Sequence, residues 1–168
     1  LIFVLALVLL LVQFSTAGAV AHRNPLRLLR TMLAAYVTAL GTQSSAATIP
    51  VTLDRTLRCG VRPSVAGFVV PLCATIHLSG STMKIVACAL AIITLGGLPV
   101  DAAAFCGVIL MLGITMVAAP GVPGGAIMAA AGLLQSMLGF DEVAVGLMIA
   151  LYIAMDSFGT ATNVTGDG

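Results

Sequence analysis

Charged residues are scarce in this sequence: Asp, Glu, Lys and Arg make up 8% of its 168 residues, and tryptophan is absent. A soluble domain carries about 25% charged residues, so the composition argues against a soluble fold. Hydrophobic residues reach 60% and the mean hydropathy is +1.18, values that indicate an integral membrane protein. The apolar runs are continuous and do not alternate with polar residues, which predicts an all-α membrane protein rather than a barrel.

Several functional motifs are also missing. The net charge is +1, and no basic patch or aromatic series predicts a nucleic-acid partner. There is no Walker loop, dinucleotide fingerprint or metal cluster, and the cysteines show no C-x-x-C spacing, so we expect no enzyme activity and no cofactor. An intramembrane aspartyl protease is disfavoured because Asp156 and Asp167 would lie about 16 Å apart on one helix. His77 and Ser79 are two residues apart and would not face each other on a helix as a catalytic dyad.

A polar stripe closes the chain. Asp156, Thr160, Asn163 and Asp167 are spaced four, three and four residues apart, so they share one face of a helix. Each carboxylate costs about 2.5–3.5 kcal/mol near the middle of a bilayer. Such a stripe persists where it faces a protein interior with cationic or hydrogen-bonding partners. The stripe is therefore a binding-site hypothesis, and the alternative is the polar face of a soluble amphipathic helix.

The first half of the chain divides into three segments. Residues 1–21 are long enough to form one transmembrane span, and the arginines that follow place its end on the cytoplasmic side. Residues 25–62 have basic flanks and a serine-rich break at 41–50, which predicts a re-entrant hairpin that enters and leaves on the same side. Residues 63–95 form a span broken at 75–82. It carries Lys84, which needs a partner or a path to the interface.

The second half repeats this plan with the opposite orientation. Residues 102–140 have acidic flanks and a Gly/Pro-rich break at 118–125, which predicts a second re-entrant hairpin. Residues 143–168 form the last span, which carries the polar stripe. Inverted repeats with discontinuous transmembrane helices are typical of secondary transporters. The sequence lacks an initiator methionine, and we interpret it as a piece of a longer protein or of a degraded reading frame.

Four motifs resemble a known family in order and spacing. TQSSAATIPVTL (42–53), PLCATIHLSGS (71–81), GVPGG (121–125) and DSFGTATNVTGD (156–167) are similar to the signatures of the dicarboxylate/amino acid:cation symporter (glutamate transporter) family. The resemblance covers residues 1–168 and identifies them with the C-terminal half of a family member, a partial transport domain. It implies alternating access, a multi-pass protein of the cell membrane and a homotrimer.

The resemblance also implies roles for individual residues. Asp156 would hold the ammonium of an amino acid, and Asn163 its α-carboxylate. The backbone at the two hairpin tips would complete the carboxylate site, and Thr160 would line it. The implied substrate-binding residues are Ser44, Ser45, Val122, Asp156, Thr160 and Asn163. Sodium, the coupling ion, would be held by side chains or backbone carbonyls of Cys73, Thr75, His77, Asn163 and Asp167.

Departures from the family pattern bear on the substrate and the ion. The family's substrate-pairing arginine is replaced by Gly159 on the last helix and by Gln43 at the first hairpin tip. A substrate carboxylate in addition to the α-carboxylate would be buried without a cation to pair with, so a neutral amino acid is expected. The family motif N-M-D-G-T reads H-L-S-G-S here, with His77 for Asn and Ser79 for Asp. Two interpretations follow. In the first, fewer sodium ions are coupled to transport. In the second, the protonatable His77, or the Lys84 ammonium in place of a bound cation, supports transport that is coupled to protons or to no ion.

Two alternatives to neutral amino acid symport stay open. One is a symporter of dicarboxylates or acidic amino acids. The other is a channel-like structural membrane subunit, because re-entrant hairpins also occur in channels. Saturable uptake that depends on a counter-ion would distinguish a symporter from a channel.

Overall fold

The computed structural model describes residues 1–97 and 99–168, and these residues form helices and turns without a strand. This confirms the predicted all-α fold. The helices are α1 (Ile2–Ala21), α2 (Pro25–Thr42), α3 (Ser45–Arg58), α4 (Pro63–Ile76), α5 (Ser79–Leu95), α6 (Ala102–Met116), α7 (Gly125–Leu138), α8 (Glu142–Ala154) and α9 (Asp156–Gly166).

Side-chain caps fix where several helices begin. Asn24 Oδ1 accepts hydrogen bonds from the N–H groups of Leu26 and Arg27, and Pro25 occupies the first position of α2. Asp101 and Asp141 cap α6 and α8 in the same way. These short polar residues interrupt the apolar runs and satisfy backbone N–H groups that would otherwise lack partners.

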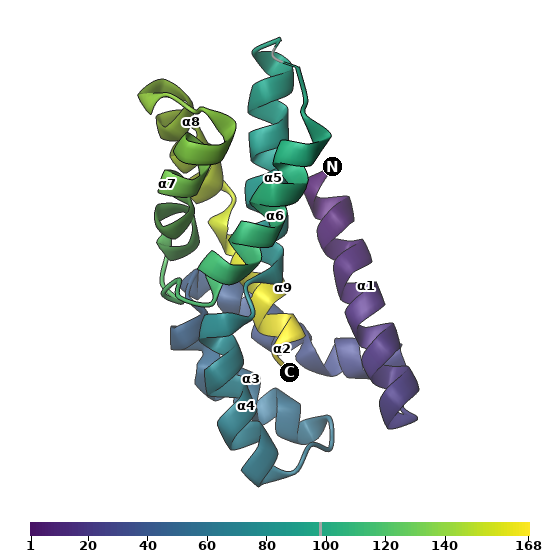
Figure 1. Ribbon diagram of the computed structural model, residues 1–168. Coiled ribbons are helices and arrows are strands. Elements are labelled where there is room, and N and C mark those ends of the chain that lie inside the picture. The colour runs from purple at the N-terminus through teal and green to yellow at the C-terminus, as the bar shows by residue number, and fades with distance from the viewer. Residues whose placement is uncertain (98) are drawn as a thin grey trace.

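Helix α9 runs through the middle of the molecule, and the chain ends there (Figure 1). It packs against α1, α2, α3, α5 and α8. Most of its residues are buried, although its sequence is among the most polar of the chain. The polar groups of α9 must therefore find partners on the surrounding helices.

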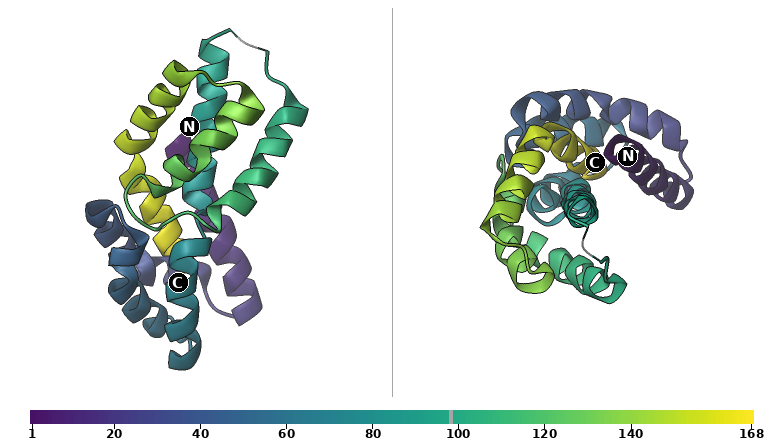
Figure 2. Two further views of the ribbon diagram at one scale, coloured as in Figure 1. Left: turned by 60° about the vertical axis from the view of Figure 1, so that its left-hand side comes forward. Right: turned by 90° about the horizontal axis from the view of Figure 1, so that it is seen from above.

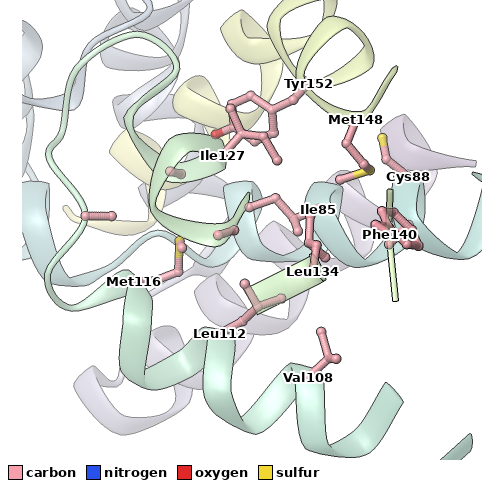
Figure 3. Packing of buried hydrophobic residues seen from close by; sticks show 14 of the residues in the cluster. Ile85, Cys88, Val108, Leu112, Met116, Ile127, Leu134, Phe140, Met148 and Tyr152 are labelled. Carbon is pink, nitrogen blue, oxygen red and sulfur yellow. The ribbon is translucent and has the colours of Figure 1, made fainter. Parts of the chain in front are cut away.

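Apolar side chains form two separate cores. The larger one joins α5, α6, α7 and α8 and includes Ile85, Leu112, Ile127 and Met148 (Figure 3). The smaller one joins α1, α2 and α9 around Phe14 and other residues. In a bilayer such cores are held by van der Waals packing rather than by exclusion of water, so close fit decides their stability. Helix α5 belongs to the larger core and α9 to the smaller one, and the two helices pack against each other (Figure 2).

Two pairs of consecutive helices coincide with the predicted hairpins. Helices α2 and α3 pack together across the α2–α3 turn, Gln43–Ser44, and α6 packs with α7 across the α6–α7 turn, residues 117–124. Their re-entrant course in a membrane and the inverted repeat stay predictions. The break predicted at 41–50 is wrong in extent, because Pro50 lies inside α3. The helix restarts at Ser45 because Ser44 Oγ accepts from Ala47 N at 3.2 Å.

Two further breaks interrupt the long apolar segments. The break between α4 and α5 is limited to His77 and Leu78, and is shorter than the predicted 75–82. Helices α8 and α9 meet at Met155 with a bend of 62°, so the predicted last span is bent immediately before its polar stripe. Among the described residues, α1 and the joined segment Pro63–Leu95 are long and apolar enough to cross a membrane, and the α8–α9 pair qualifies if it is counted as one bent span. The chain is that of a membrane protein.

Candidate functional site

All four members of the polar stripe on α9 are buried. Asp156, Thr160, Asn163 and Asp167 each expose less than a tenth of their surface. Each contacts a different neighbour, so the stripe is divided into separate polar contacts along the helix. Asp156 contacts the α6–α7 turn, and Thr160 contacts the α2–α3 turn. Asn163 contacts the start of α5, and Asp167 contacts the α4–α5 break.

Asp156 forms a buried ion pair with Lys84. Lys84 Nζ lies 3.1 Å from Asp156 Oδ1, and the two residues are 1% and 3% exposed. The other carboxylate oxygen, Oδ2, accepts from the backbone N–H of Gly124 at 2.8 Å. Lys84, which needed a partner by sequence reasoning, therefore has one, and Asp156 links α5 to the α6–α7 turn. Breaking such a pair by removing one partner leaves an uncompensated buried charge.

Asn163 is bonded to the first turn of α5. Its Oδ1 accepts from Gly80 N at 2.8 Å and from Ser81 N at 3.2 Å, and its Nδ2 donates to Ser81 Oγ at 2.9 Å. These N–H groups have no partner within α5 because they belong to its first residues. The helices can approach this closely because residue 80 is glycine: a Cβ there would lie 2.7 Å from Thr162 Cβ. Asn163 therefore fixes α5 against α9.

Asp167 faces the α4–α5 break. Its Oδ1 lies 2.8 Å from His77 Nδ1, and the other ring nitrogen of His77 lies 3.1 Å from Gln13 Nε2. Gln13 Nε2 also donates to Ser79 Oγ at 3.3 Å, while Gln13 Oε1 is buried and has no hydrogen-bond partner among the described residues. Sequence reasoning missed Gln13, although it is the one side chain with an amide in the apolar run of residues 1–21.

The other residues expected to bind sodium contribute less to the cluster that Asp167, His77 and Gln13 form at the α4–α5 break. The Cys73 carbonyl accepts from His77 N at 2.9 Å, so it lies at the break. The Thr75 side chain is exposed and donates to the Leu72 carbonyl, so the structure does not bring its hydroxyl into the cluster. Of the expected sodium-binding residues, His77 and Asp167 are in direct contact through their side chains, and the Asn163 carbonyl accepts from Asp167 N at 3.0 Å.

The two interhelical turns meet beside α9. Ser44 Oγ donates to the Gly121 carbonyl at 2.8 Å, and the same carbonyl accepts from Ala46 N at 3.2 Å. Thr160 Oγ1 donates to the Gln43 carbonyl at 3.5 Å, which is a weak hydrogen bond at most. Residues from the first hairpin, the second hairpin and α9 are therefore brought together, although they are distant in the sequence.

A small cavity lies where the two turns meet α9. Its volume of about 10 Å³ is room for about one water molecule. Its lining includes Ser45, Ser81, Val122, Asp156, Thr160 and Asn163. Five of the six expected substrate-binding residues therefore surround one cavity, and the sixth, Ser44, bonds the Gly121 carbonyl at its edge. The cavity is far smaller than any amino acid.

Comparison with known proteins identifies relatives of this chain. The sequence profile of the Sodium:dicarboxylate symporter family matches residues 1–168. The serine/threonine transporter SstT of Acinetobacter baumannii is 37% identical over 136 residues, which are 78% of this chain and 34% of that protein. SstT of Acinetobacter baylyi is 32% identical over 164 residues, 94% of this chain and 41% of that protein.

A human protein also matches. Excitatory amino acid transporter 2 of Homo sapiens is 30% identical over 151 residues, which are 88% of this chain and 26% of that protein. The chain thus spans between about a quarter and two fifths of the length of these curated relatives. Each of these relatives is named as a transporter and none as an enzyme.

Proposed function

Because the chain belongs to the Sodium:dicarboxylate symporter family, we propose that residues 1–168 are a partial transport domain in a cation-coupled symporter of an amino acid. The observation that carries this proposal is the meeting of the α2–α3 turn, the α6–α7 turn and the buried carboxylate of Asp156 around one cavity. Buried ionisable groups within membrane helices are costly and mark substrate or ion pathways. The names of the relatives support amino acid transport.

The proposed domain has two re-entrant hairpins, 25–62 and 102–140. They accompany a span at 1–21, a broken span at 63–95 and a polar-striped span at 143–168. The α2–α3 and α6–α7 turns act as gates in alternating access. Support comes from the Gly121 carbonyl, which accepts from both Ser44 Oγ and Ala46 N and so joins the two hairpins beside the cavity. The protein would be a homotrimer that crosses the cell membrane several times, as the family resemblance implies.

The substrate would be a neutral amino acid. Its ammonium binds Asp156, and its α-carboxylate binds near Asn163, Thr160 and the backbone of the two turns, at Ser44, Ser45 and Val122. The described lining of the cavity holds no arginine or lysine, and the nearby Lys84 ammonium is already paired with Asp156. A second substrate carboxylate would therefore lack a free cation, and a buried unpaired charge is strongly unfavourable. An acidic substrate is the competing proposal, favoured by the family name, which specifies dicarboxylates.

Sodium is the first candidate for the coupled ion, because the family is named for it. Asp167 would supply a carboxylate oxygen, and the carbonyls of Cys73, Thr75 and Asn163 would supply neutral oxygens, which are ligands that suit a hard cation. His77 fits less well, since its imidazole nitrogen lies against Asp167 Oδ1 and offers no oxygen. We therefore propose that sodium binds here more weakly than at a site with an asparagine in place of His77.

Uptake into proteoliposomes tests the proposal. The protein, in the form that its source cells express, is supplied with labelled serine, threonine, alanine or aspartate. Each substrate is measured with a sodium gradient, with a proton gradient and with neither. Saturable, gradient-dependent uptake of serine or alanine is expected. Non-saturable flux would instead support a channel, and preferential uptake of aspartate would contradict the neutral substrate.

A further inference from the structure

Lys84 and Asp156 come from helices that are far apart in the sequence, yet their charged groups meet, and Asp156 also lines the proposed substrate cavity. The Lys84 ammonium lies 3.1 Å from Asp156 Oδ1 and 3.3 Å from the Tyr152 carbonyl. It also lies 3.4 Å from the centre of the Tyr152 ring, over its face. Within residues 1–97 and 99–168, Asp156 is the only ion-pair partner of Lys84. The cation is thus held by an anion, a carbonyl and an aromatic face.

Gly159 leaves the space that the Lys84 ammonium occupies. A Cβ at position 159 would lie 3.0 Å from Lys84 Nζ and 3.2 Å from Lys84 Cε. By the family resemblance, residue 159 is a position where an arginine can pair with a substrate carboxylate. Here α5 supplies a cation beside that position, so there is a positive charge that inspection of residue 159 alone does not reveal.

A ligand ammonium that binds Asp156 competes with Lys84 for the Oδ1 atom. Of the two carboxylate oxygens, Oδ2 already accepts from Gly124 N at 2.8 Å, and Oδ1 faces Lys84 Nζ. Lys84 also lines a second cavity of about 230 Å³ between α1, α2, α5 and α9, which gives its flexible side chain room to move. The walls of that cavity are mainly apolar, so a displaced ammonium gains no counter-charge there.

We propose that Lys84 is a specificity-determining residue whose pairing with Asp156 sets the net charge of the accepted ligand at zero. A zwitterion places its ammonium on Asp156, and its α-carboxylate, held near Asn163 and Thr160, takes the released Lys84 ammonium as its counter-charge, so every buried charge keeps a partner. A cation without a carboxylate leaves Lys84 unpaired, and a ligand with an additional carboxylate leaves an anion in excess. This inference rests on the proposed amino acid site and assigns to that site the chemistry that selects its ligand.

Three probes of similar skeleton and different charge separate the possibilities. Serine is a zwitterion; ethanolamine is serine without its carboxylate; glycerate has a hydroxyl group in place of the ammonium. Binding of each probe is measured by calorimetry on the purified protein in the form that its source cells express, at fixed sodium and pH. We expect the wild-type protein to bind serine at least tenfold more tightly than either other probe.

Single substitutions should shift the preferred charge in opposite directions. Lys84→Met leaves a net negative site, so the affinity for ethanolamine relative to serine should rise at least tenfold. Asp156→Asn leaves a net positive site, so the relative affinity for glycerate should rise by a similar factor. Arg58→Met is the matched control, because it removes a cation paired with Asp54 on the surface and should leave the preference unchanged.

The double variant Lys84→Met/Asp156→Asn protects the test against misfolding of the single variants. It removes both charges together, leaves no unpaired ion, and should bind the three probes with no preference for the zwitterion. A retained preference for serine in this variant, or an equal loss of affinity for all three probes in Lys84→Met, would overturn the inference. Failure of the wild-type protein to bind or take up any amino acid would instead contradict the proposed function itself.

Discussion

The His77 imidazole and the Asp167 carboxylate are 2.8 Å apart across the α4–α5 break. The contact joins residues ninety positions apart in the sequence and places a nitrogen ligand beside a carboxylate that is proposed to hold sodium. Calcium and other hard cations prefer oxygen ligands, and sodium shares this preference. If Asp167 holds sodium as proposed, the pair links the sequence of the break to the ion dependence of transport.

Replacing His77 by asparagine should strengthen the sodium dependence. The change substitutes an amide oxygen for an imidazole nitrogen next to Asp167, so we expect the half-saturating sodium concentration to fall by about tenfold, a typical effect for residues around a metal site. Uptake is measured against sodium concentration at constant ionic strength. His22→Asn is the control, because His22 is exposed at the end of α1. An unchanged or raised half-saturating concentration in His77→Asn would contradict the prediction.

Replacing Asn163 by alanine should destabilise the protein. The substitution leaves the N–H groups of Gly80 and Ser81 buried without their acceptor, at a cost of about 1–3 kcal/mol each. Thermal unfolding in detergent should show a clear drop in the midpoint. Asn24→Ala removes an exposed helix cap worth about 1 kcal/mol and should cause a smaller drop. Equal drops for the two variants would show that the Asn163 amide is not a structural link between α5 and α9.

Replacing Gly80 by alanine should also destabilise the protein, by a different mechanism. The new Cβ would lie 2.7 Å from Thr162 Cβ and 2.8 Å from the Gly159 carbonyl, so α5 and α9 must move apart. Overpacking of this kind costs about 1–3 kcal/mol. Gly67→Ala is the matched control in α4, where a Cβ would meet nothing within 4 Å, and it should be neutral or slightly stabilising. The midpoint of thermal unfolding distinguishes the two variants.

Replacing Ser44 by alanine should loosen the contact between the two turns. The Ser44 hydroxyl donates to the Gly121 carbonyl and accepts from Ala47 N, so its loss removes both a turn-to-turn bond and the cap of α3, worth about 0.5–2 kcal/mol. Hydrogen exchange at the amides of residues 46 and 47 should become faster.

The control for this change is Ser136→Ala. Ser136 is exposed, and its hydroxyl donates to the Leu133 carbonyl within α7. Exchange at residues 46 and 47 should be the same in this variant as in the wild-type protein. If Ser44→Ala also leaves the exchange unchanged, the Ser44 hydroxyl does not hold the two turns together.

Local sequence signals located most helices and their breaks. Asn24 with Pro25 marks the start of α2, and the Gly/Pro-rich residues 118–125 mark the α6–α7 turn closely. Pro50 misled the prediction, because a proline can be retained within a helix at the loss of one backbone hydrogen bond. The helix boundary followed the cap at Ser44 instead.

Partners across the molecule could not be predicted in the same way. Residue types and spacing identified Asp156 and Asn163 as buried polar groups, but not their contacts. The packing of the helices decides whether Asp156 pairs with Lys84 and whether the Asn163 amide forms hydrogen bonds with α5. Packing depends on small residues such as Gly80 and Gly159, whose role is visible only when the neighbouring helix is in place.

Competition during counterflow tests the central claim, that the site bounded by the two turns and α9 carries a neutral amino acid. Proteoliposomes loaded with unlabelled serine accumulate external labelled serine, and an excess of external alanine or aspartate is then added. The account predicts that alanine abolishes the accumulation and that aspartate has little effect. Equal inhibition by aspartate would contradict it, because the site would then accept a second carboxylate for which it offers no free cation.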